Sequence, residues 1–282
     1  MATNDFLEAE RRERPRVAVA AGIAALLTLG GWIIPRIALG GSRPDNGLSV
    51  LMLFNEHRTS LIAGTLLSMA GLAAVVYVLD FLARAAANRN SIPPLIRPLL
   101  LIVGAVVIVA STVLVFVSTG RQHTWAVDSS LTFEEARAVS RLGIGIYPVL
   151  IAQFAFTITM GFVAVSAMRA GLLSRFLGIL GGISAVLFTF PLLDIPIVQA
   201  YWLLMLALTL WSVGGAREPP AWQSGEAIPW PSSAELREQR VRAAEEARGE
   251  RGEIDAVVVE DDENAVAAGE SAGQRRKRKK RR

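Results

Sequence analysis

The sequence predicts an all-α membrane protein, in which a polytopic bundle of six transmembrane helices precedes a charged, largely disordered C-terminal tail. Of its 282 residues, 52% are apolar and only 19% are charged. The charges are unevenly spread, because residues 1–216 hold 15 Lys and Arg and 11 Asp and Glu, whereas residues 217–282 hold 14 of each. Such an apolar first part excludes an ordinary soluble domain. The lack of Cys excludes disulfides, zinc-thiolate sites and thiol catalysis.

Six apolar stretches come close to the length of about 20 residues that a helix needs to cross the hydrocarbon core. They are Val17–Pro35, Ser60–Leu82, Pro98–Ser118, Ile144–Met168, Phe176–Leu193 and Ile197–Gly215. Each is continuously apolar rather than alternating, which favours helices over barrel strands. Asp80 and Arg84 lie four residues apart at the end of the second stretch, where we expect them to pair. The first stretch is longer than the apolar core of a typical signal peptide, so we expect it to remain in the protein.

The distribution of Arg predicts that both termini are cytoplasmic, in a chain that we expect to lie in the cell membrane, that is, the inner or plasma membrane. With the N-terminus inside, the inner segments carry nine Arg and the longer outer loops carry six. The chain ends in eight consecutive cations, whose translocation would be unfavourable. We expect Trp32 and Trp202 to anchor one membrane interface and Trp211 the other.

The outer loops hold the only two histidines, His57 and His123, together with several carboxylates. Their spacing matches no metal-binding motif, so we expect no metal site and no cofactor. Thr132 and Glu135 have the spacing of a capping box, which predicts a short helix before the fourth span.

Polar residues within the spans are few and uncharged. Gln153 and Thr157 lie one turn apart on the fourth span, and Gln199 lies near the start of the sixth. We expect them either to hydrogen-bond between helices or to line a transport path toward the connection that contains Asp194. In the fifth span, the GxxxG of Gly178–Gly182 predicts a close helix contact.

Catalytic signatures are missing from the sequence. No His lies inside a span to bind haem, no Ser and His pair suits intramembrane proteolysis, and no phosphate-binding loop or Arg ladder is present. We therefore expect that the protein is not an enzyme.

The composition divides the chain into four parts: an N-terminal cytoplasmic segment (1–16), the transmembrane domain (17–215), a cytoplasmic linker with a charged helix (216–248) and a disordered tail (249–282). The tail is acidic and then basic. Its final cations are Arg275, Arg276, Lys277, Arg278, Lys279, Lys280, Arg281 and Arg282. They are suited to anionic phospholipid, to a cytoplasmic protein, to pairing with the acidic stretch of the tail, or simply to fixing the topology. We do not expect nucleic acid as the partner, since no aromatic platform accompanies them.

Two segments resemble a known family. They are Asn55-Glu56-His57-Arg58 before the second span, and Ser166-Ala167-Met168-Arg169-Ala170-Gly171-Leu172-Leu173-Ser174-Arg175-Phe176-Leu177-Gly178 between the fourth and fifth spans. They are similar to bacterial six-span membrane proteins that are classified only as a domain of unknown function. The resemblance covers about residues 17–215. It implies the six-span architecture and a bacterial membrane, and it implies no catalytic residue.

The leading hypothesis from the sequence is a membrane protein that acts as a structural or interaction component, whose polybasic tail contacts lipid or a partner. The alternative is a small transporter or lipid-handling protein that uses Gln153, Thr157, Asp194 and Gln199. The spans themselves imply membrane lipids as neighbours in either case.

Overall fold

The computed structural model describes residues 2–40, 47–127, 132, 135, 146–190, 196–211, 219 and 221–229, and the single positions 235, 237, 238, 241 and 242. The chain forms two compact units, Met1–Trp230 and Pro231–Arg282. The five described positions of the second unit are helical. All regular structure in the described part of the first unit is α-helical, which confirms the predicted all-α class.

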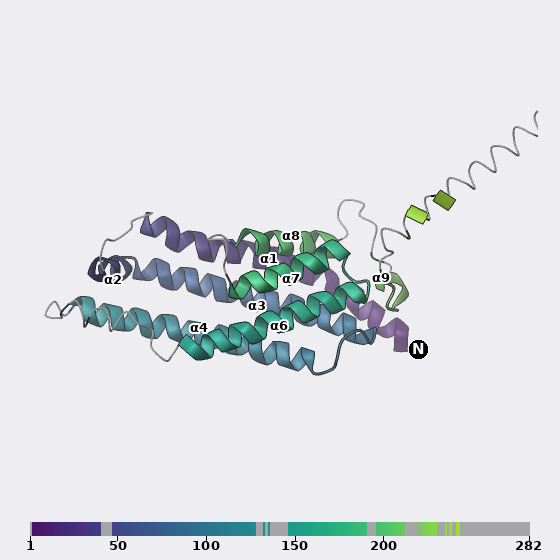
Figure 1. The fold of residues 1–282 in the computed structure, drawn as a ribbon, viewed down its shortest axis with the longest axis horizontal. Coiled ribbons are helices and arrows are strands. Elements are labelled where there is room, and N and C mark those ends of the chain that lie inside the picture. The colour runs from purple at the N-terminus through teal and green to yellow at the C-terminus, as the bar shows by residue number, and fades with distance from the viewer. Residues whose placement is uncertain are drawn as a thin grey trace, which may run out of the picture. The chain divides into compact units, whose positions relative to one another are not determined.

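The longer helices of the first unit lie side by side, and each runs in the opposite direction to the one before it (Figure 1). They are α1 (Ala2–Leu39), α2 (Gly47–Glu56), α3 (Arg58–Asn88), α4 (Ile96–Val127), α6 (Ile146–Arg169), α7 (Arg175–Thr189), α8 (Ile197–Trp211) and the single turn α9 (Ala221–Ser224). Helix α1 packs most extensively against α3 and also contacts α8, while α6 packs between α4 and α7.

Within the part of the chain that the structure describes, four helices are long and apolar enough to cross a membrane, namely Asp5–Leu39 within α1, α3, Ile96–Thr124 within α4 and Tyr147–Arg169 within α6. Large apolar side chains on these helices point away from the bundle, such as Leu26, Ile102 and Ile158, which are 71%, 63% and 70% exposed. Large apolar side chains that are exposed along helices of this length are typical of a surface that faces lipid. The chain is therefore a membrane protein.

The predicted fifth and sixth spans correspond to the shorter helices α7 and α8. Each has 15 residues, which gives a length of about 22 Å against a hydrocarbon core of about 30 Å. The predictions extend these helices to Leu193 and Gly215, and residues 191–193 and 212–215 lie outside the described residues.

Helices α1 and α3 approach each other closely at glycines. A Cβ atom on Gly31 would lie 2.7 Å from the carbonyl oxygen of Gly64 and 2.8 Å from the backbone nitrogen of Ser68. A Cβ atom on Gly64 would overlap the ring of Pro35. The two backbones can therefore meet here only because neither residue has a side chain, as is common between transmembrane helices.

Two expectations about α7 and α8 are corrected. Trp202 is not an interfacial anchor, because its side chain is fully buried and its indole nitrogen donates to the Leu177 carbonyl at 3.1 Å. The indole ring lies against Gly181, where a Cβ atom would be 2.9 Å from Nε1. Of the predicted pair, Gly178 does lie against a neighbouring helix, since a Cβ atom there would be 2.6 Å from the Met168 Cβ, whereas a Cβ atom on Gly182 would meet nothing within 4 Å. The second glycine in contact is Gly181. Trp211 is 57% exposed, as expected for a residue that faces lipid.

Two local contacts that the sequence predicts are confirmed. The backbone N–H and the hydroxyl of Thr132 both donate to the Glu135 carboxylate, at 2.7 and 2.8 Å. The Glu135 half of the capping box is therefore present. Arg84 donates to Asp80 at 3.0 Å along α3, as their spacing indicates.

Candidate functional site

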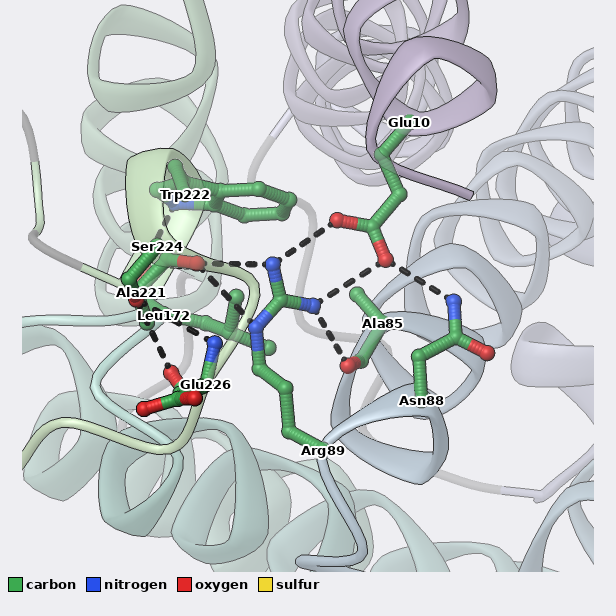
Figure 2. A network of polar contacts seen from close by, with 9 residues as sticks. All are labelled: Glu10, Ala85, Asn88, Arg89, Leu172, Ala221, Trp222, Ser224 and Glu226. Carbon is green, nitrogen blue, oxygen red and sulfur yellow. Dashed lines mark hydrogen bonds and ion pairs between the residues drawn. The ribbon is translucent and has the colours of Figure 1, made fainter. Parts of the chain in front are cut away.

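A buried arginine joins three distant parts of the chain at the end of the bundle that contains the start of α1. Arg89 is the C-cap residue of α3, and its side chain is fully buried. It donates to both carboxylate oxygens of Glu10 at 3.0 and 2.9 Å, and to the carbonyls of Ala85 at 2.7 Å and Ala221 at 2.8 and 3.2 Å (Figure 2). Asn88 also donates to Glu10, at 2.9 Å. Both charges thus have several polar partners, which a buried ion pair requires.

Trp222 is held within the same cluster. Its ring stacks on Phe81 with 5.7 Å between centroids, and the guanidinium carbons of Arg14 and Arg89 lie 4.8 and 5.5 Å from the Trp222 ring centroid. The indole nitrogen donates to the Leu172 carbonyl at 3.0 Å. These contacts hold the segment after α8 against α1, α3 and the connection between α6 and α7.

Gly171, between α6 and α7, permits a further close contact with the segment after α8. Its φ of +76° lies in the left-handed region that favours glycine, and a Cβ atom here would overlap the carbonyl oxygen of Ile228. The chain from Ala221 to Pro229 therefore packs against the bundle. The contacts of Arg89, Trp222 and Gly171 together form what we call the terminal lock.

A second group of charges lies further along α1 and α3. Arg84 donates to the two Glu13 oxygens at 2.9 and 2.7 Å, and Tyr77 donates to Glu13 at 3.3 Å. Asp80 accepts from Arg84 and, at 2.7 Å, from Arg97 on α4. These ion pairs connect α1, α3 and α4.

The charged groups of both clusters are engaged with one another, and they join α1, α3, α4 and the segment after α8. Among the described residues, no group of three His, Asp or Glu is placed to bind a metal ion. His123 Nδ1 on α4 lies 3.0 Å from Asn55 Oδ1 on α2.

A cavity of about 480 Å³ lies among α1, α3, α6, α7 and α8. Its walls are mainly apolar, with side chains that include Leu72, Val75, Phe156, Met160, Leu187, Phe188 and Leu203. The polar side chains of its lining come from four helices and are Thr28, Arg36, Ser68, Ser184 and Gln199. Apolar walls with a few polar groups are typical of a site for a small organic ligand.

Two polar side chains of the lining, Ser184 and Arg36, differ from the rest in their surroundings. Ser184 is fully buried, and within the described structure its hydroxyl has no hydrogen-bond partner. Arg36 stands in the last turn of α1 with its guanidinium carbon 4.7 Å from the centroid of the Trp32 ring, and both residues line the cavity. The cavity therefore has a buried hydroxyl in its wall and a cation beside an aromatic ring.

A second cavity of about 340 Å³ lies among α1, α2, α3 and α4. It shares Gly31, Pro35, Ser68 and Met69 with the first cavity. The close α1–α3 contact at Gly31 and Gly64 thus separates the two spaces. Arg36, Ser184 and Gln199 line the first cavity alone.

The structure separates the polar residues that the sequence groups together. Gln199 lines the cavity. Thr157 hydrogen-bonds to Thr189, which also donates to the Gln153 carbonyl at 3.3 Å, so this pair connects α6 to α7 and does not line the cavity. Asp194 and the cations at 275–282 lie outside the described residues.

Reasoning from the sequence missed both Ser184 and the position of Arg36 in the cavity lining. The available signal for Arg36 was its spacing of four residues from Trp32 at the end of an apolar run. A single Ser in a Gly- and Ala-rich helix carries no such signal. The terminal lock was missed because Glu10, Arg89 and Ala221 are far apart in the chain, and no local pattern connects them.

No known protein family, curated protein or solved structure matches the sequence. What the chain does therefore has to follow from the cavity and from the helices around it.

Proposed function

We propose that this chain is a multi-pass protein of the bacterial inner membrane that binds one amphiphilic molecule in the cavity among α1, α3, α6, α7 and α8. It would act as a lipid-handling protein or small transporter, without catalysing a reaction. The observation that carries this proposal is the cavity itself. Its volume of about 480 Å³ falls in the range of ligand sites, whereas helix bundles that serve only as scaffolds are packed without such spaces.

The cavity favours the lipid-handling alternative over a purely structural role. A cavity with apolar walls inside an apolar bundle is most readily filled from the surrounding bilayer. The absence of a catalytic motif in the sequence supports binding rather than chemistry. The proposed ligand contacts Ser184, Gln199 and Arg36, rather than the predicted Gln153 and Thr157.

The proposed topology has six crossings and two cytoplasmic termini. Helices α7 and α8 would complete the fifth and sixth spans together with the residues that flank them. Support comes from the terminal lock, since Arg89 contacts both Glu10 and Ala221 and so brings the start of α1 and the segment after α8 to one end of the bundle. An even number of crossings between them fits this position.

The polybasic tail has a separate part in the proposal. Its eight cations would lie beside the inner leaflet, where each contributes about 1 kcal/mol of attraction to anionic phospholipid. A cytoplasmic protein is the other partner that this charge suits. Neither partner is needed for the cavity to bind its ligand.

Filling the cavity with a larger side chain is expected to weaken ligand binding by about tenfold or more, because the side chain and the ligand would then compete for the same space. The variant is Ser184→Leu, which places a larger side chain in the wall of the cavity. Binding would be measured with the purified protein in lipid discs, by titrating a fluorescent monoacylglycerol and following its emission. Monoacylglycerol is uncharged, so the titration tests the cavity without any contribution from a charged headgroup.

The matched control is Val186→Leu, on the same helix but at a position that is 50% exposed, and it should bind like the unchanged protein. Because Ser184 is fully buried, a second variant, Leu187→Trp, fills the cavity from a partly exposed position in case Ser184→Leu does not fold. Equal affinities for a folded cavity variant and Val186→Leu would refute the proposed function.

A further inference from the structure

The single cation of the cavity lining marks one end of the space. Among the described residues that line the cavity, Arg36 is the charged one. It lies near the end of the cavity-lining stretch of α1, which runs from Thr28 to Leu39 over about 16 Å. The Arg36 side chain is exposed and stacks over Trp32, a pair of side chains suited to the headgroup level of a membrane. An anionic group of a ligand would lie here.

Ser184 provides a second polar contact away from that cation. Its hydroxyl is fully buried and has no partner in the described structure. On other helices, the hydroxyls of Thr65, Thr112 and Thr159 each donate to the carbonyl four residues earlier. An unpaired buried hydroxyl is unfavourable, so a ligand that accepts its hydrogen bond would be selected. The other polar side chains of the lining, Thr28, Ser68 and Gln199, are uncharged, so the ligand group that meets Ser184 is uncharged too.

The remaining wall fits a hydrocarbon chain. Leu72, Val75 and Met160 contribute apolar surface from α3 and α6. The volume of about 480 Å³ suits a ligand of drug-like size, which corresponds to one acyl chain with its polar linkage rather than a whole two-chain lipid.

We propose that the cavity binds one ester-linked acyl chain of an anionic phospholipid, with the phosphate at Arg36, the ester or glycerol oxygen at the Ser184 hydroxyl, and the chain against the apolar wall. A lysophospholipid and a two-chain phospholipid that inserts one chain share this chemistry. This inference rests on the proposed function and deepens it by naming the ligand class.

Three probes of equal chain length separate the contacts. Lysophosphatidate offers the phosphate and the ester, monoacylglycerol offers the ester without the phosphate, and an alkyl phosphate offers the phosphate without the ester. Each would compete with the fluorescent monoacylglycerol for the purified full-length protein in uncharged discs. We expect lysophosphatidate to bind about fivefold more tightly than monoacylglycerol, as expected for one cation near a phosphate. It should bind about two- to tenfold more tightly than the alkyl phosphate, as expected for one hydrogen bond.

Each preference should disappear in one variant only. Arg36→Gln should remove the preference over monoacylglycerol and retain monoacylglycerol binding, which shows that the cavity is intact. Ser184→Ala should remove the preference over the alkyl phosphate. The matched controls are Arg16→Gln, an exposed arginine toward the other end of α1, and Ser111→Ala on α4, and both should keep the two preferences.

Competition by two-chain phosphatidate identifies the source of the chain, and tighter binding of either lipid supports the proposal. A preference for lysophosphatidate that persists in both Arg36→Gln and Ser184→Ala would overturn it. So would equal binding of all three probes by the unchanged protein, while the weaker binding of Ser184→Leu would still support the proposed function. If not even monoacylglycerol binds, the proposed function itself fails.

Discussion

Replacing Arg89 by Met is expected to lower the free energy of unfolding by about 3–5 kcal/mol, the largest effect that we predict for one substitution. The side chain of Arg89 is fully buried and that of Glu10 is only 8% exposed. Loss of the guanidinium leaves the Glu10 carboxylate buried with Asn88 as its remaining partner in the described structure, and it removes both hydrogen bonds to the Ala221 carbonyl. Unfolding would be followed by circular dichroism during titration of mixed micelles with a denaturing detergent.

Two further variants separate charge burial from loss of packing. Arg97→Met removes a cation that is 48% exposed, so its cost should be about 0–1 kcal/mol, as for other exposed ion pairs. In Glu10→Met with Arg89→Met, no carboxylate is left unpaired, so much of the lost stability should return. If Arg89→Met and Arg97→Met were equally stable, the terminal lock would not stabilise the bundle.

Adding one methyl group at Gly31 is expected to destabilise the protein by about 1–3 kcal/mol, because α1 and α3 must move apart. The new Cβ atom would lie 2.7 Å from a carbonyl oxygen and 2.8 Å from a backbone nitrogen of α3, which cannot rotate away as a side chain can. The neighbouring Gly30→Ala is the matched control, since a Cβ atom there meets nothing within 4 Å. That change should be neutral or stabilise the helix by up to about 1 kcal/mol.

The same detergent titration measures both glycine variants, and the predicted sign differs between them. A loss of stability in Gly31→Ala together with none in Gly30→Ala would locate the effect at the helix contact. Equal changes in the two variants would show that helix propensity, rather than the α1–α3 distance, decides stability.

The helical fold was predictable because the apolar runs are continuous and long, and the helices α1, α3, α4 and α6 contain the predicted spans apart from Ile144–Gly145 at the start of the fourth, which lie outside the described residues. Helix lengths were less accessible. Hydropathy reports which residues avoid water, and it does not report where a helix ends. Hydropathy therefore could not predict that α1 begins at Ala2, well before the predicted span at Val17. Nor could it predict that α7 and α8 have 15 residues each.

Contacts between distant residues were the least predictable part. Asp80 and Arg84 are four residues apart on one helix, so periodicity alone pairs them. Nothing in the spacing of Glu10 and Arg89 does so, because their contact depends on how α1 packs against α3. Trp202 shows the opposite error, since a Trp near the end of an apolar run is typical of an interface, yet this one is buried against Gly181.

The candidate site was found only in part for a similar reason. Gln199 could be recognised as a polar residue inside an apolar span, and it does line the cavity. A cavity is a property of five packed helices, however, and its volume depends on side chains that do not fill it. The sequence has no pattern that marks such a space. The unpaired hydroxyl of Ser184 became visible only once its surroundings were known.

The most direct test of ligand binding is a native mass spectrum of the protein released from lipid discs made with its own membrane lipids. We expect one molecule of phospholipid size to remain bound to the unchanged protein after gentle activation, and to be lost from Ser184→Leu but not from Val186→Leu under the same conditions. An unchanged protein that emerges without a bound molecule, or an adduct that survives equally in all three proteins, would contradict a lipid-binding cavity among α1, α3, α6, α7 and α8.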